Sequence, residues 1–147
     1  MILAQIDCLR VQYDESLCLL RYQWCGGSSL HSFAQAMNYL AELVQTHQIK
    51  RVLVDMNGLP ELSMKEQIWV GVSWFPRVAA QSVQHVAVVV PPAATYNQMV
   101  VESLLGFSRQ ITRFDVQFFA DPGSALDWLT NSPIHMLALL AEWQSAS

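Results

Sequence analysis

The chain has 147 residues, close to the length of one ordinary domain. Its formal net charge is −4, and the 8 basic residues are scattered rather than clustered. This distribution does not favour nucleic acid or an anionic membrane surface as a partner. Charged residues make up only 14% and apolar residues 52%, so we expect some apolar surface to meet another protein.

The start of the chain resembles neither a secretory signal nor a membrane anchor. Residues 1–7 lack a basic start and a long apolar stretch, and no apolar run approaches the ~20 residues of a membrane-spanning helix. We therefore expect a cytoplasmic protein without a transmembrane segment. The three cysteines, Cys8, Cys18 and Cys25, are expected to be reduced thiols.

An apolar strand-like run is followed four times by a segment with helical spacing. Helices of this length return the chain so that successive strands run parallel, with right-handed crossovers, in an α/β layer structure. The pairs are residues 17–24 and 29–47, 52–55 and 64–79, 86–90 and 93–108, and 114–119 and 122–130. A turn at residues 14–17 makes the first of these strands the second half of a hairpin.

The first helix is predicted to begin after a glycine turn, with Ser29 near its N-terminus. Its apolar residues recur three or four positions apart and form one stripe toward the sheet. The predicted buried residues are Phe33, Ala36, Met37, Leu40, Ala41, Leu43 and Val44.

The second helix carries the clearest local signals. Asn57 and Gly58 are turn residues, and Ser63 with Glu66 fits the capping box of a helix N-terminus. Pro76 lacks an N–H and should kink or end this helix.

The later strands differ in the pattern of their side chains. Residues 52–54 and 86–90 are continuously apolar, which is typical of buried parallel strands that are neighbours or near-neighbours. In residues 114–119, apolar and polar side chains alternate, and this pattern predicts an edge strand with one side exposed to solvent. Asp121 and Pro122 have the pattern of an N-cap followed by a first-turn proline.

Several strand ends and core positions form a set that can be compared with known families. They are Tyr22-Gln23-Trp24 before a glycine turn, Arg51-Val52-Leu53-Val54-Asp55, Trp74-Phe75-Pro76-Arg77, residues 86–90 ending in prolines, and Phe118-Phe119-Ala120-Asp121 with Ala125 and Trp128-Leu129. Together these segments resemble a bacterial family of small STAS-like proteins, relatives of the anti-sigma factor antagonists, over roughly residues 6–130. The resemblance implies a superhelix of four β–α units, preceded here by an N-terminal strand in a hairpin and followed by a short C-terminal helix.

The resemblance implies a regulatory serine at the start of the second helix, where Ser63 stands. The family's usual Asp-Ser-Ser-Gly run is missing, and the local sequence is Glu61-Leu62-Ser63-Met64-Lys65. Ser63 is therefore either a phosphorylation site or simply a helix cap.

No catalytic set or metal site is predicted. The four histidines, His31, His47, His85 and His135, fall on different elements and lack ligand spacing. We expect a non-enzymatic protein without a cofactor or metal, acting as a protein-interaction or regulatory module. The expected partner-binding surface lies at the carboxyl ends of the strands and comprises Asp55, Asn57, Gly58 and Ser63, beside Pro91 and Pro92.

The alternative function is the binding of a small apolar molecule or a lipid. Trp69, Trp74 and Tyr96 could line a pocket between the second and third helices, and the lipid-transfer fold called CRAL-TRIO resembles the STAS architecture. Core packing explains the same aromatic residues.

Residues 133–143 form an apolar, helix-forming stretch beyond the STAS-like region. We take residues 1–131 as the α/β domain and 132–147 as a C-terminal helix and tail, which belongs to the same domain or to a dimer interface. So short a helix must dock to be stable. Apolar residues on several sides predict a homodimer with Ile134, Leu137, Leu140 and Trp143 in its interface.

Overall fold

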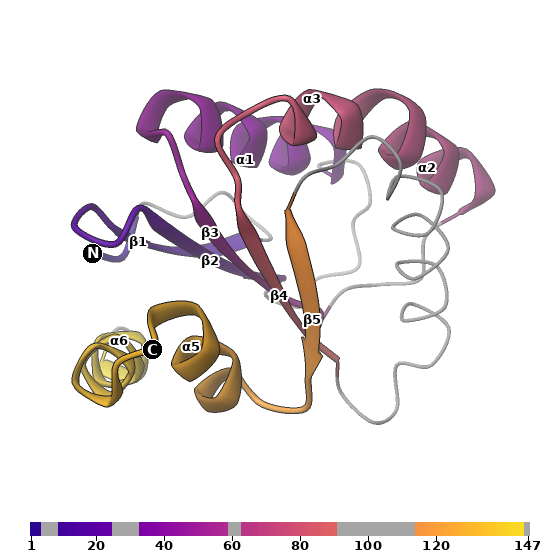
Figure 1. Ribbon diagram of the computed structural model, residues 1–147. Coiled ribbons are helices and arrows are strands. Elements are labelled where there is room, and N and C mark those ends of the chain that lie inside the picture. The colour runs from indigo at the N-terminus through magenta and orange to yellow at the C-terminus, as the bar shows by residue number, and fades with distance from the viewer. Residues whose placement is uncertain (4–8, 25–32, 59–62, 91–113, 146–147) are drawn as a thin grey trace.

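The computed structural model describes residues 1–3, 9–24, 33–58, 63–90 and 114–145, and these form a five-stranded sheet between two layers of helices (Figure 1). The strands lie in the consecutive order β1-β2-β3-β4-β5, so the predicted α/β class is confirmed. The elements are β1 Leu9–Asp14, β2 Leu19–Trp24, α1 Phe33–His47, β3 Arg51–Asp55, α2 Met64–Trp69, the π-helical turn η2 Val70–Trp74, α3 Phe75–Ala79, β4 His85–Val89, β5 Asp115–Phe119, α5 Pro122–Thr130 and α6 Pro133–Ser145.

The sheet pairing follows the sequence pattern. β1 and β2 form the antiparallel hairpin, and β2 to β5 pair in parallel. β3 and β4 are direct parallel neighbours, as their continuous apolar character predicted. β5 lies at the edge, with Asp115 and Gln117 exposed. The helix predicted at residues 93–108 falls outside the described residues.

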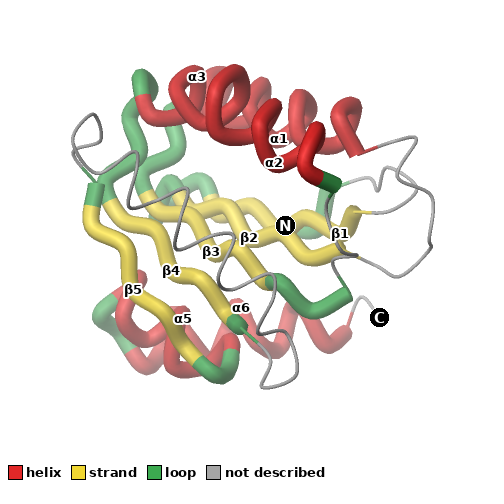
Figure 2. The backbone as a smooth tube through the Cα atoms, turned by 90° about the vertical axis from the view of Figure 1, so that its right-hand side faces the viewer, coloured by secondary structure: helices red, strands yellow, loops and turns green. Residues whose placement is uncertain are grey.

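One face of the sheet is covered by α1 and by the continuous α2–η2–α3 segment (Figures 1 and 2). All seven residues predicted for the buried stripe of α1 are buried. They pack with the apolar side chains of β1 and β2, including Leu9, Val11 and Tyr22. Helical spacing alone was therefore enough to orient α1.

Pro76 neither ends the second helix nor leaves it a regular α-helix. The turn before it widens into η2, where the Phe75 N–H donates to the Val70 carbonyl, five residues back. A regular α-helix would need an N–H at Pro76 for the Val72 carbonyl. The widened turn changes the hydrogen-bond ladder just before the proline, which then occupies the first turn of α3.

The opposite face of the sheet is covered by α5 and α6 (Figure 2). The Asp121 side chain accepts the Ser124 N–H at 2.8 Å and Pro122 follows it, which confirms the predicted cap of α5. Ala125, Leu126 and Leu129 pack with Leu53 and other sheet residues. No helix in the described ranges is long and apolar enough to cross a membrane.

Candidate functional site

Asp55 is the last residue of β3, and its side chain is buried under the sheet instead of lying at the protein surface. It follows Leu53 by two residues and so points to the face covered by α5 and α6. Its side chain is 2% exposed. Its Oδ1 atom accepts hydrogen bonds from the Asn57 backbone N–H at 2.9 Å and from Asn57 Nδ2 at 2.6 Å. Asp55 therefore fixes the turn after β3 and offers little surface to a partner.

Ser63 is exposed and forms the predicted capping box. Its Oγ atom accepts the Glu66 N–H at 3.2 Å, while the Ser63 N–H donates to Glu66 Oε1 at 2.8 Å. The turn that leads toward it contains Gly58, whose φ of 84° favours glycine. Ser63 is the N-cap of α2, a helix of the layer on one face of the sheet (Figure 1), whereas the Asp55 side chain leaves β3 on the opposite face, as Leu53 does. Asp55 and Ser63 therefore do not share one surface.

The two tryptophans predicted to line a pocket are engaged by α1. Trp69 meets Phe33 edge-on, with the ring centroids 6.2 Å apart. Trp74 donates from Nε1 to the Met37 carbonyl at 2.6 Å. These contacts favour core packing for both residues. Tyr96, Pro91 and Pro92 lie outside the described residues.

An apolar stripe runs along the outer side of α2 and η2. It consists of Met64, Ile68 and Val72, which are four residues apart and 70%, 57% and 69% exposed. Large apolar side chains this exposed, in a row beginning at the capped end of a helix, are typical of surfaces that bind another protein. We call these three residues the α2 stripe.

The C-terminal helix α6 docks on its own domain. Leu139 and Trp143 are buried, whereas Ile134 and Leu137 are 81% and 61% exposed. Leu140 is half-buried beside the cluster below the sheet. Of the four residues predicted for a dimer interface, Trp143 is thus turned into its own chain, and Ile134 and Leu137 remain available.

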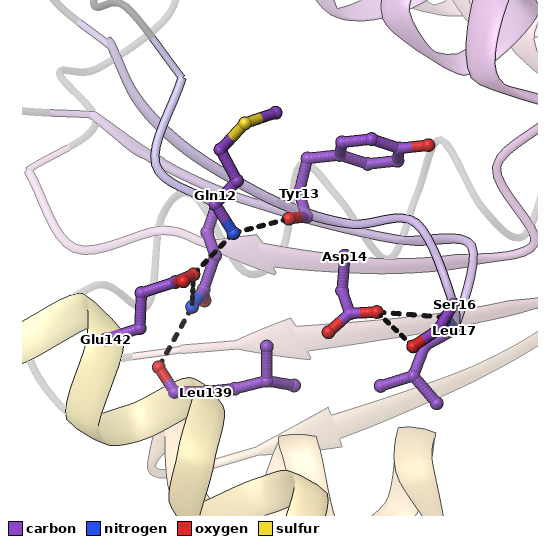
Figure 3. Close-up of polar contacts among 8 residues, drawn as sticks. Gln12, Tyr13, Asp14, Ser16, Leu17, Leu139 and Glu142 are labelled. Atoms are coloured by element: carbon purple, nitrogen blue, oxygen red, sulfur yellow. Dashed lines mark hydrogen bonds and ion pairs between the residues drawn. The ribbon is translucent and has the colours of Figure 1, made fainter.

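A polar seam, made of Gln12, Glu142 and the Met1 amino group, ties α6 to β1 (Figure 3). Gln12 Nε2 donates to the Leu139 carbonyl and to Glu142 Oε1, each at 2.9 Å. The amino group of Met1 donates to the same Glu142 oxygen at 2.6 Å. These hydrogen bonds lower the pKa of Glu142.

Beside this seam lies an arginine cluster formed by Arg10, Arg21, Asp55 and Trp143. The guanidinium carbons of Arg10 and Arg21 lie 4.0 and 3.8 Å from the centroid of the Trp143 ring, a cation–π arrangement. Arg10 also donates to the Trp143 carbonyl. Arg21 is 2% exposed, and its Nη2 atom lies 3.9 Å from Asp55 Oδ2.

Burial gives the arginine cluster unusual electrostatics. Desolvation lowers the pKa of Arg21 to about 10, against the opposing effect of Asp55, and Arg10 lowers it further. At neutral pH Arg21 still carries its charge. The cluster therefore holds a charged, buried arginine between the Trp143 ring and the Asp55 carboxylate.

Sequence reasoning missed this cluster. Arg10, Gln12 and Arg21 alternate with the buried apolar residues of the hairpin, which is the usual pattern of a solvated sheet face. The available signal was the C-terminal helix, which must dock on another surface to be stable.

Among the described residues, no three His, Cys, Asp or Glu side chains are grouped so that they could hold a metal ion. Comparison with protein-family models, curated proteins and solved structures finds no match to this chain.

Proposed function

We propose that this chain is a STAS-like protein-interaction module that acts without catalysis and binds another protein through the α2 stripe. The observation that carries the proposal is the exposure of Met64, Ile68 and Val72 along one capped helix. Burying such side chains against a partner contributes about 1.5–3 kcal/mol each before the costs of association. The expected partner presents an apolar groove that receives this helix.

Two features support the STAS-like part of the proposal. The strands follow one another in consecutive order across the sheet, which is the order expected of a superhelix of β–α units. Ser63 lies exposed at the start of the helix after β3, where the resemblance implies a regulatory serine. A phosphate there would add negative charge at a helix N-terminus and directly beside the α2 stripe.

A capture experiment tests the α2 stripe. The tagged chain is compared with Ile68→Glu and with the control Gln45→Glu, which changes an exposed residue of α1. A partner identified by mass spectrometry is purified, and its affinity for each variant is measured by calorimetry. We expect the control to bind like the wild type and Ile68→Glu to bind at least tenfold more weakly, which is about 1.4 kcal/mol. Equal affinities would contradict the proposal.

A test of the regulatory role of Ser63 requires two variants that both preserve the helix cap. Asn and Asp both cap helices well, but only Asp carries a charge. If phosphorylation regulates binding, Ser63→Asp changes the affinity for the purified partner and Ser63→Asn does not. Identical behaviour of the two variants would leave Ser63 as a structural cap only.

A further inference from the structure

Helix α6 covers a face of the hairpin whose polar groups it does not fully match. The side chains of Arg10, Gln12 and Arg21 lie on this face. Within the described ranges, the buried side-chain atoms without a hydrogen-bond partner are Gln12 Oε1, Arg21 Nε and Arg21 Nη1, and all three belong to residues that contact α6. Buried polar atoms in proteins almost always have partners. The docked position of α6 therefore leaves polar groups unsatisfied that water would satisfy if the helix moved away.

The attachment of α6 to the hairpin is confined to one part of the helix. The buried residues of α6 are Leu139 and Trp143. Gln12 donates to the Leu139 carbonyl and to Glu142 Oε1, between these two residues (Figure 3). Arg10 donates to the Trp143 carbonyl. Releasing this part of the helix is therefore enough to free α6 from the hairpin.

The junction between α5 and α6 can act as a hinge. Asn131 ends α5 in the left-handed conformation, with a φ of 50°, and only Ser132 separates it from α6. In the described part of the chain, the hydrogen bonds of these two residues stay within residues 127–136, so none of them ties the junction to the sheet. Leu126 and Leu129 hold α5 in the cluster under the sheet. The helix α6 can therefore turn away while α5 stays in place.

We infer that α6 is a displaceable cover, which leaves the hairpin by turning about Asn131 and Ser132 while the rest of the domain stays folded. In the closed state the Trp143 ring lies against the guanidinium groups of Arg10 and Arg21, and the cover keeps this polar face from any other molecule. In the open state water reaches Arg21, and the Trp143 ring becomes accessible. The device is independent of the α2 stripe, which belongs to the helical layer on the other face of the sheet (Figure 1).

Native-state hydrogen exchange of the ¹⁵N-labelled full chain, followed by NMR at increasing urea concentration, tests the cover directly. The probes are the backbone N–H of Leu139, in the middle of α6, and the Nε–H of Arg21, beneath it. The backbone N–H of Leu40, in the middle of α1, reports unfolding of the whole domain. After correction for intrinsic exchange rates, each probe gives an opening equilibrium constant.

We expect Leu139 and Arg21 to share one opening constant, roughly tenfold or more larger than that of Leu40. This constant should depend little on urea, because opening of α6 exposes much less surface than unfolding of the domain. The wild type alone therefore decides whether α6 opens separately.

Two variants separate opening of the cover from unfolding. Trp143→Leu keeps an apolar residue but removes the ring from the guanidinium groups, so it should increase opening at both Leu139 and Arg21. Val44→Ala, the matched control, weakens the core on the other face of the sheet. It should increase exchange at Leu40 and leave Leu139 and Arg21 unchanged, because it weakens the closed and open states equally.

Two results would overturn the inference. If Leu139 and Leu40 have the same opening constant and the same urea dependence, α6 leaves the sheet only when the whole domain unfolds; Val44→Ala would then increase exchange at both probes. If Arg21 stays protected while Leu139 exchanges, the helix unwinds without uncovering the hairpin.

Discussion

The Ser63 side chain contributes to stability whatever its regulatory role. It satisfies one of the free N–H groups at the start of α2, and Glu66 completes the capping box. Replacing Ser63 with Ala should lower the free energy of unfolding by about 1 kcal/mol, measured by urea denaturation. Ser63→Asn, which keeps a capping oxygen, should stay within a few tenths of a kcal/mol of the wild type. Equal losses in both variants would contradict this role for the hydroxyl.

Asp55 illustrates how one buried carboxylate can hold both a turn and an ion pair. Asp55→Asn keeps an oxygen for Asn57 but leaves the buried Arg21 without its counter-charge. We expect a loss of about 3 kcal/mol in the free energy of unfolding, because removing one partner of a buried pair strands the other charge. Asp115→Asn, on the exposed side of β5, should change it by less than about 0.5 kcal/mol. A small effect at both positions would mean that Arg21 is stabilised in another way.

At the scale of elements, sequence patterns predicted those features that interactions between residues near in the chain determine. The stripe of α1, the caps of α2 and α5 and the buried strands follow from spacing and hydrogen-bond chemistry within a few residues. The widened turn before Pro76 could not be predicted in this way. The proline explains why a regular helix fails, but continuation of the helix also depends on contacts with α1, such as the bond from Trp74 to Met37.

The polar seam makes the docking of α6 sensitive to acid. Hydrogen bonds from the Met1 amino group and Gln12 lower the pKa of Glu142 below its ordinary value of 4.5. A lowered pKa in the folded state gives stability that is present above pH 4.5 and is lost as the pH falls through the folded-state pKa. Glu142 is 41% exposed in its side chain, so solvent screens part of this contribution.

Glu142→Gln tests this dependence. The difference in unfolding free energy between wild type and Glu142→Gln should be largest near neutral pH and should shrink on acidification below pH 4.5, measured by urea denaturation at each pH. Glu42→Gln, on the exposed side of α1, makes the same formal charge change away from α6 and is the control. A difference that grows on acidification would contradict the assigned sign.

At the scale of the whole molecule, the arginine cluster shows where sequence reasoning stops. Arg10 and Arg21 belong to the hairpin, Asp55 ends a later strand, and Trp143 lies near the end of the chain. Each residue alone has an ordinary explanation as a solvated charge, a turn carboxylate or an apolar helix residue. Pairing of β1, β2 and β3 places Arg10, Arg21 and Asp55 on one face of the sheet, and docking of α6 adds Trp143. No local pattern in the sequence encodes the contact with Trp143.

The same docking leaves an apolar surface on the outer side of α6, where Ile134 and Leu137 are exposed three residues apart. We expect two copies to bury these residues against each other about a two-fold axis, because a self-complementary surface closes in that way. Light scattering should then give twice the chain mass of 16.6 kDa.

The combined change Ile134→Glu and Leu137→Glu should produce a monomer, because it would place like charges in the interface. Met64→Glu is the matched control, since Met64 is 70% exposed and begins α2, which lies in the helical layer on the other face of the sheet (Figure 1). Point changes are preferable to ending the chain at Asn131, which would also remove Leu139 and Trp143 from beneath the sheet. A monomeric wild type would exclude self-association. A dimer that persists in the double variant but is lost in Met64→Glu would place the interface on another part of the surface.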